Sequence, residues 1–200
     1  MENLYSNISC RFNCRIAFRR SLGFFICVLM ICLASCKQHI PDNCKPYFQY
    51  DEIEHYQIMI DEDKVMDMQE KKHPTKDEKE LSDIIIQNSP ASIKDSSFLK
   101  HLKRLSFKEY KINPKYHDGI SAIFCERKHP GAVYAACIAM YRDILVFRRE
   151  HKICGIAKIC FNCGESYILG TKCNTAEFGQ SGDYDALYKI LDSNMKQQIK

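Results

Sequence analysis

The sequence predicts an α+β fold, with short helices followed by a four-stranded antiparallel meander and a C-terminal helix packed on the sheet. Three observations lead to this prediction. Apolar residues recur at helical spacing between residues 75 and 124, β-branched and aromatic runs with short polar breaks fill residues 133 to 169, and helical spacing returns after residue 183. With 200 residues, of which 46% are hydrophobic, the chain has the size and composition of one ordinary globular domain.

A short strand over residues 56–60 and then three helices are expected ahead of the sheet. The first helix begins at Thr75, whose side chain can form a capping box with Glu78. The second begins at the serine pair 96–97, and the third begins at Asn113-Pro114, since proline suits the first helical position. Their apolar stripes, which are typical of helices that pack on a core, comprise Leu81, Ile84 and Ile85, then Phe98, Leu99, Leu102 and Leu105, then Tyr116, Ile120, Ile123 and Phe124.

The meander is expected to contain the runs Val133 to Tyr141, Ile144 to Arg148, Ile153 to Cys160 and Ser166 to Leu169. Only a few polar residues separate consecutive runs, and a parallel crossover needs about a dozen or more, so neighbouring strands should be antiparallel. Because the runs are apolar on both faces, helices should cover at least one face of the sheet. The last helix begins at Gly182-Asp183 and should fold back on the sheet through Tyr184, Leu187, Tyr188, Leu191 and Met195.

The charge balance argues against nucleic acid as a partner. The chain carries a formal net charge of +4, but four arginines and one glutamate lie in its first 35 residues, which leaves 25 basic and 24 acidic groups in the remainder. That remainder lacks the basic excess of a nucleic-acid-binding domain. Residues 36–89 are acidic overall and residues 90–200 are basic overall, so we expect these two parts to pack against each other.

The N-terminal segment is typical of a secretory signal peptide. Four arginines, the last two at Arg19-Arg20, precede the uncharged run Leu22 to Ser35, which ends in small residues. Its 14 residues are too few to cross a hydrocarbon core, which needs about 20. An uncleaved membrane anchor and a buried apolar helix are the alternatives. A twin-arginine export signal is disfavoured, because Gly23 stands where that signal usually has an apolar residue.

The junction Leu33-Ala34-Ser35-Cys36 resembles the lipobox of bacterial lipoproteins, in which an aliphatic residue and two small residues precede a cysteine. The resemblance implies that Cys36 carries a diacylglycerol, that the preceding peptide is removed, and that the new amino terminus is acylated, for example with palmitate. Lys37, in place of an acidic residue, implies sorting to the outer rather than the inner membrane. The expected organisation is a signal peptide over residues 1–35, a lipidated tether over 36–50 and a single α+β domain over 51–200.

Seven cysteines follow Cys36, and this odd number means that at least one thiol stays free or pairs outside the chain. Cys125 and Cys137 are interpreted as small buried hydrophobic residues. The other late cysteines form a dense cluster that comprises Cys154, Cys160, Cys163 and Cys173.

The dense cysteine cluster has three interpretations. In the first interpretation the cluster binds zinc, although only one Cys-x-x-Cys pair is present. Alternatively, Cys160 and Cys163 form a redox pair, although this pair ends a strand instead of beginning a helix. The favoured interpretation is structural, as a disulfide or as reduced thiols at a tight turn.

A loop rich in glycine, asparagine, threonine and serine joins the last strand to the last helix, over residues 170–183. It is longer than most connections, so it is a candidate binding loop, with an ordinary exposed loop as the alternative. The candidate binding residues are Thr171, Lys172, Asn174, Gln180 and Asp183. The sequence contains no motif of a zinc metalloprotease, a nucleophile-elbow hydrolase or a phosphate-binding loop, so no catalytic residue is predicted.

The last third of the chain is similar to a group of small uncharacterised lipoproteins of Bacteroidota. The similarity lies in Tyr141 to Phe147, Gly155 to Cys163, Gly170-Thr171 and Phe178 to Tyr184. It implies a bacterial origin and no particular activity.

Together these features predict a lipid-anchored protein of the cell envelope. It would contact the membrane through its anchor and act by binding a protein partner, for example as an immunity or inhibitor protein. No cofactor is expected apart from the covalent lipid on Cys36. The alternative is a thiol-dependent redox or metal-binding protein that uses Cys160 and Cys163. An enzymatic role is less favoured than a binding role.

Overall fold

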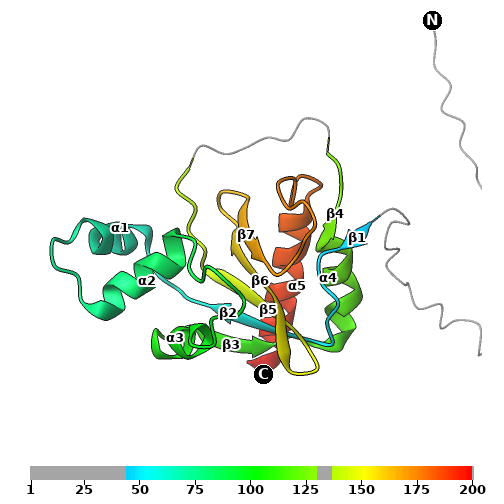
Figure 1. Cartoon of the computed structure of the whole chain (residues 1–200), viewed down its shortest axis with the longest axis horizontal. Coiled ribbons are helices and arrows are strands. Elements are labelled where there is room, and N and C mark those ends of the chain that lie inside the picture. Colours follow the sequence, from blue (N-terminus) through cyan, green and yellow to red (C-terminus); the bar gives the residue numbers. More distant parts are fainter. Residues whose placement is uncertain (1–43, 130–136, 200) are drawn as a thin grey trace, which may run out of the picture. The chain divides into compact units, whose positions relative to one another are not determined.

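The computed structural model describes residues 44–129 and 137–199. Cys36, the lipobox and the signal segment lie outside these residues, as do residues 133–136 of the expected strand Val133 to Tyr141. Figure 1 shows the arrangement of the helices and strands. The helices are α1 (Glu62–Glu70), α2 (Lys76–Ile86), α3 (Phe98–Arg104), α4 (His117–Ile123, after the 3₁₀ turn η1, Pro114–Tyr116) and α5 (Asp183–Gln198). The strands are β1 (Lys45–Pro46), β2 (Glu52–Gln57), β3 (Lys108–Lys111), β4 (Cys125–Glu126), β5 (Asp143–Arg149), β6 (Lys152–Cys160) and β7 (Glu165–Leu169).

The larger sheet has five antiparallel strands in the order β3-β2-β5-β6-β7, and β1 pairs with β4 in a separate small sheet. The α+β class and the C-terminal helix are therefore confirmed, whereas the four-stranded meander is wrong. Three of its expected strands correspond to β5, β6 and β7, which do form a meander. The remaining expected strand, Val133 to Tyr141, does not form over residues 137–141. β2 lies beside β5 instead.

The backbone of the segment before β5 forms a hydrogen bond outside the sheet. The N–H of Tyr141 donates to the carbonyl of Ile85, at the end of α2, over 2.8 Å. Each backbone N–H has one hydrogen to donate. The N–H of Tyr141 is therefore not available for a hydrogen bond to a neighbouring strand. The edge of β5 is then free to pair with β2, from Glu52 opposite Arg148 to Gln57 opposite Asp143.

Local capping signals position two of the predicted helices. The side chain of Thr75 accepts the N–H of Glu78 over 3.2 Å, and the Glu78 carboxylate accepts the N–H of Thr75 over 2.7 Å, so the capping box is confirmed. The Asn113 side chain accepts the N–H of Lys115 over 3.1 Å and begins the turn η1, which continues into α4. The helix α1 and the edge strand β3 were not among the predicted elements.

Helices cover both faces of the large sheet. Ile144 and Val146 of β5 pack in one apolar cluster with residues of α1, α2 and α3. Leu145 and Phe147 pack in a second cluster with residues of α4 and α5. This alternation follows from strand geometry, in which successive side chains point to opposite faces. It explains why the strand sequences are apolar throughout, and Figure 1 shows the two groups of helices on opposite sides of the sheet.

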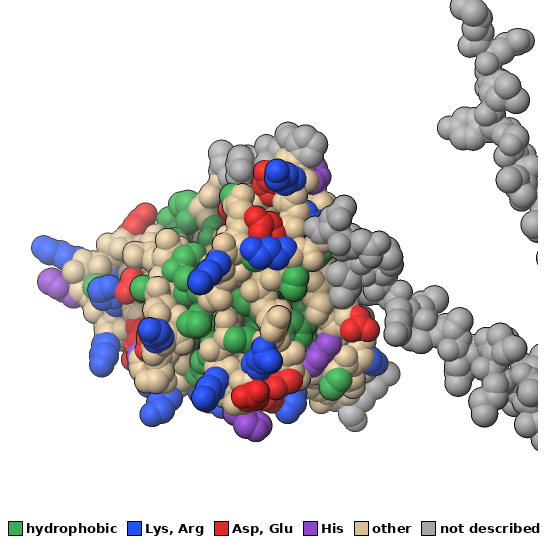
Figure 2. Space-filling view, turned by 45° about the vertical axis from the view of Figure 1, so that its right-hand side comes forward, with side chains coloured by type: hydrophobic (Ala, Val, Ile, Leu, Met, Phe, Trp, Pro, Cys, Tyr) green, Lys and Arg blue, Asp and Glu red, His purple; other side chains and the backbone are tan. Residues whose placement is uncertain are grey.

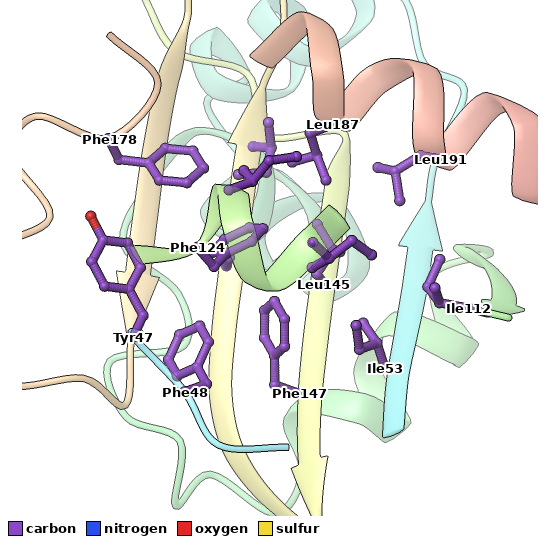
Figure 3. Packing of buried hydrophobic residues seen from close by; sticks show 14 residues of the cluster. Tyr47, Phe48, Ile53, Ile112, Phe124, Leu145, Phe147, Phe178, Leu187 and Leu191 are labelled. Carbon is purple, nitrogen blue, oxygen red and sulfur yellow. The ribbon is translucent and has the colours of Figure 1, made fainter. Parts of the chain in front are cut away.

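Aromatic rings join the N-terminal end of the described chain to the sheet (Figure 3). Tyr47 and Phe48 are buried, and the ring of Phe48 lies 4.5 Å from that of Phe147 in β5, between ring centroids. Phe124 at the end of α4 packs 5.0 Å from Phe147 and 5.0 Å from Phe178. The last part of the expected tether, residues 44–50, therefore belongs to the folded domain.

The acidic and basic parts of the chain pack together, as their charges predict. Glu54 of β2 accepts two hydrogen bonds from the guanidinium of Arg148 in β5, at 2.9 and 3.1 Å. Glu52 pairs with Lys111 at 2.6 Å across the β2–β3 ladder. On the face seen in Figure 2, acidic and basic side chains are intermixed, so the charges neutralise one another locally.

Candidate functional site

Three cysteines gather where β6 ends. Cys137 and Cys163 form a disulfide with their Cα atoms 6.3 Å apart, and Cys160, the last residue of β6, keeps a free thiol. All three line one surface pocket of about 230 Å³. Arg142 and Glu62 supply its charged side chains. We call this set of residues the thiol pocket.

The segment after Cys137 holds both sulfurs of the Cys-x-x-Cys pair. The N–H of Met140 points at the Cys160 sulfur over 3.3 Å, and the Cys163 sulfur lies 3.6 Å from the carbonyl oxygen of Ile138. Cys160 is only 2% exposed, whereas Cys137 is exposed. The pocket thus holds a buried thiol and a disulfide with one exposed half.

The guanidinium of Arg142 brings a positive charge to the thiol pocket. Its Nε donates to the carbonyl of Ile60 over 2.9 Å, and one terminal nitrogen lies 3.5 Å from the sulfur of Met140. A neighbouring cation is a common feature of reactive-cysteine sites, and here Glu62 adds a carboxylate to the same pocket. The pocket therefore contains the groups that thiol–disulfide chemistry uses: a free thiol, a disulfide and a cation.

Cys154 and Cys173 are not part of this cluster. The Cys154 thiol lies near the start of β6 and donates to the carbonyl of Phe147 over 3.4 Å, and burial raises its pKa. The Cys173 sulfur, in the loop before α5, lies 3.7 Å from the carbonyl of Pro46. Of the four clustered cysteines named from the sequence, the fold brings only Cys160 and Cys163 together. Across residues 44–129 and 137–199, no three cysteine, histidine or carboxylate side chains group as metal ligands would.

Two cysteines have roles that the sequence did not predict. Cys125 is buried as expected and Cys137 is exposed, but neither is a free hydrophobic residue, because both are in disulfides. Cys125 pairs with Cys44, with 5.6 Å between Cα atoms, and the Cα separations of both disulfides fall within the usual range for this bond. The two pairings span 81 and 26 residues, and spacing along a sequence does not identify partners at such separations.

The candidate binding loop between β7 and α5 is held by local turns. The side chain of Thr171 accepts the N–H of Cys173 over 3.0 Å, and that of Asn174 accepts the N–H of Ala176 over 3.0 Å. The backbone of Gln180 donates to the carbonyl of Glu177 over 3.4 Å. These are the short side-chain turns that asparagine and threonine form.

Longer-range contacts attach the same loop to the rest of the domain. Phe178 inserts into the aromatic cluster and is 6% exposed, and the hydroxyl of Tyr47 donates to the carbonyl of Asn174 over 3.2 Å. Asp183 accepts a 3.1 Å hydrogen bond from Arg127. Burial raises the pKa of Asp183, and the guanidinium of Arg127 partly opposes this shift. Lys172 is exposed.

Lys158 is a buried cation that the sequence analysis did not single out. It lies in the middle of β6 and is 0% exposed, and its ammonium donates to the carbonyls of Gln87 and Ser89, the latter at 3.0 Å. The rings of Tyr141 and Tyr167 lie 4.6 and 5.4 Å from the ammonium nitrogen. Burial lowers the pKa of Lys158 to about 7. Through these two carbonyls, Lys158 caps the chain where α2 ends.

Larger hollows lie elsewhere on the described surface. Two hollows of about 520 and 450 Å³ border α1 and α2, and no cysteine lines either of them. Their walls combine lysines, carboxylates and methionines, without an unpaired buried polar atom directed into them. The smaller thiol pocket is therefore the better candidate for chemistry.

Comparisons with known proteins do not identify a family. No protein family, no curated protein and no solved structure matches the chain. Within the described ranges, no helix combines the length and apolar character that crossing a membrane requires.

Proposed function

We propose that the chain is a lipoprotein of the bacterial cell envelope, anchored through acyl chains on Cys36, and that its domain acts by binding a protein partner. The observation that carries the anchor is Leu33-Ala34-Ser35-Cys36, directly after an uncharged run and four arginines. Each buried methylene contributes about 0.8 kcal/mol, so one acyl chain binds reversibly while two or more hold a protein on the bilayer. A cysteine with both a diacylglycerol and an acylated amino terminus exceeds that requirement.

The cysteine chemistry of the domain supports export. Two disulfides, Cys44–Cys125 and Cys137–Cys163, are typical of a protein in an oxidising compartment, where such bonds persist. Lys37 favours the outer membrane over the inner one, by resemblance to lipoprotein sorting signals.

The loop at residues 170–183 supports a binding role. Its turns and the buried Phe178 hold it in one conformation, while Lys172 and Asn174 stay exposed. A loop that is ordered before binding loses less conformational entropy on binding, so it binds more tightly for the same contacts. We assign the partner to the class of envelope or periplasmic proteins, of which an immunity or inhibitor pairing is one form.

The anchor is tested by labelling cells with radioactive palmitate. The wild-type chain and a Cys173→Ser control should both incorporate the label and sediment with membranes. The Cys36→Ser variant should lose the label and leave the membrane fraction. Labelling that survives the Cys36→Ser change would refute the anchor.

The binding role is tested by photo-cross-linking in cells. A photoreactive amino acid replaces Lys172 in the loop or, as a control, the exposed Lys100 in α3 on the other side of the sheet. We expect one discrete cross-linked protein from position 172 and none from position 100. Equal yields from both positions, or none from either, would contradict the loop as the binding surface.

A second candidate function is thiol-dependent redox chemistry, which the thiol pocket favours because it holds a free thiol and a disulfide together. The redox pair of Cys160 and Cys163 that the sequence suggests requires revision, since Cys163 is bonded to Cys137. Three sulfurs, rather than two, are then available to the reaction.

A further inference from the structure

We infer that the thiol pocket is a disulfide-exchange site, in which Cys163 alternates between Cys137 and Cys160 as its partner. In the second pairing Cys137 becomes a free thiol at the surface, able to react with a disulfide of another molecule. The inference specifies the second candidate function and is independent of the lipid anchor.

Cys163 shares its pocket with two other cysteines, Cys137 and Cys160. Its bonded partner, Cys137, begins the described segment that leads to β5. Cys160 ends β6 opposite Glu165 of β7, and residues 161–164 form the turn between these strands. Residues three apart across such a turn have Cα atoms within about 7 Å, close to the span that a disulfide bridges. The Cα spacing of such a turn therefore permits a Cys160–Cys163 pairing beside the observed Cys137–Cys163 bond.

One short segment, residues 138–140, contacts both sulfurs of the Cys-x-x-Cys pair. The N–H of Met140 points at the sulfur of Cys160, and the carbonyl of Ile138 lies beside the sulfur of Cys163. These two backbone groups lie two residues apart in the chain, and both sulfur-bearing residues line the same pocket.

The exchange is balanced without an external oxidant. The thiolate of Cys160 attacks the sulfur of Cys163 and forms the Cys160–Cys163 bond. The Cys137–Cys163 bond breaks, and its electron pair leaves on Cys137 as a thiolate, which takes up the proton that Cys160 lost. The number of disulfides and of thiols in the chain is unchanged.

The pocket wall carries charged side chains beside the three cysteines. Arg142 and Glu62 contribute one positive and one negative charge, and the N–H of Met140 points at the sulfur of Cys160. Among the residues that line the pocket, Arg142 supplies the basic side chain.

Exchange moves the free thiol from a buried cysteine to an exposed one, where it can react with another molecule. Cys160 is 2% exposed, so its thiol is shielded from other molecules. Cys137 is exposed, so after exchange the free thiol lies at the surface. There the Cys137 thiolate can attack an external disulfide, forming a mixed disulfide and releasing the other half of that molecule as a thiolate. The substrate class is therefore a disulfide-bearing molecule.

The test is a disulfide map of the purified full-length chain in a buffer of reduced and oxidised glutathione, quenched with acid and alkylated. Trypsin leaves Cys160 and Cys163 in one peptide, between Lys158 and Lys172, and Cys137 in another. A Cys160–Cys163 bond thus appears within a single peptide, whereas Cys137–Cys163 links two. The Cys44–Cys125 bond, seen in the same map, reports that each variant is folded.

In the Cys137→Ser variant we expect Cys160 and Cys163 to be joined within their peptide. If both are instead recovered as separate thiols or as separate glutathione adducts while Cys44–Cys125 is intact, the inference is wrong. A Cys154→Ser control should keep the wild-type map.

A second measurement does not depend on folding of the Cys137→Ser variant. Maleimide labelling of Cys137 should be slower in Cys160→Ser than in the wild type by roughly tenfold or more, because its release requires the Cys160 thiolate. Equal labelling rates in the two proteins would overturn the inference. Palmitate labelling reads Cys36 alone, so failure of the exchange site and failure of the anchor are distinguishable.

Discussion

The buried ammonium of Lys158 makes the stability of the domain depend on pH in a direction that can be measured. The Lys158→Met change keeps the side-chain length and removes the charge. It also removes the donor for the carbonyls of Gln87 and Ser89. An unpaired buried carbonyl costs about 1–3 kcal/mol, so the change carries a cost that is present at every pH.

The magnitude of the pH effect follows from the pKa. Burial lowers the pKa of Lys158 to about 7 in the folded chain, and an unfolded lysine titrates near 10.4. Between these two values the unfolded state binds more protons, so wild-type stability rises with pH across this window. The full difference corresponds to about 5 kcal/mol, of which about 2 kcal/mol is regained between pH 7 and pH 9. Lys158→Met lacks this contribution.

The assay is urea unfolding of the purified chain at pH 7 and pH 9, followed by circular dichroism. The free-energy difference between wild type and Lys158→Met should grow by about 2 kcal/mol at the higher pH, in favour of the wild type. Lys152→Met, at an exposed position of the same strand, is the control and should parallel the wild type. A Lys158→Met variant that also parallels the wild type would refute the reasoning. The two carbonyls and the rings of Tyr141 and Tyr167 would then stabilise the ammonium enough to offset its burial.

Two further changes test the packing around the N-terminal segment. Cys125→Ser opens a disulfide whose partners lie 81 residues apart. Because the unfolded chain then gains entropy, the free energy of unfolding in non-reducing urea should fall by about 4 kcal/mol. A fall of less than about 1 kcal/mol would contradict a stabilising role of the Cys44–Cys125 bond. Gly155→Ala places a methyl group against the ring of Phe48 and should cost about 1–3 kcal/mol. Combining Gly155→Ala with Phe48→Ala should cost less than the sum of the single changes, and simple additivity would argue against this contact.

The elements that were predicted correctly have local causes. The capping box at Thr75 and the proline after Asn113 act within a few residues of themselves, so they specify the starts of α2 and η1 without reference to the rest of the fold. The apolar runs of β5 and β6 are long enough to indicate strands buried on both faces.

The elements that were missed depend on distant partners. β3 has the sequence Lys-Glu-Tyr-Lys and no apolar alternation, and it is a strand because its backbone pairs with β2. Residues 137–141 are apolar enough for a strand, yet Tyr141 bonds to the end of α2. Of the candidate site, the Cys160 and Cys163 pair was visible as a motif. The third sulfur, Cys137, was not, because only folding brings it to the turn after β6.

The Cys44–Cys125 disulfide has a mechanical consequence if Cys36 is acylated as proposed. Eight residue steps separate Cys36 from Cys44, a contour of about 28 Å at full extension, so the domain would stay close to the bilayer surface. Tension on the acyl chains that reaches Cys44 would be transmitted both through the backbone and through the disulfide. The disulfide would carry it directly to β4, so the two-residue strand β1 would not bear it alone. Because Cys125 follows Phe124, the load would enter the fold beside the aromatic core.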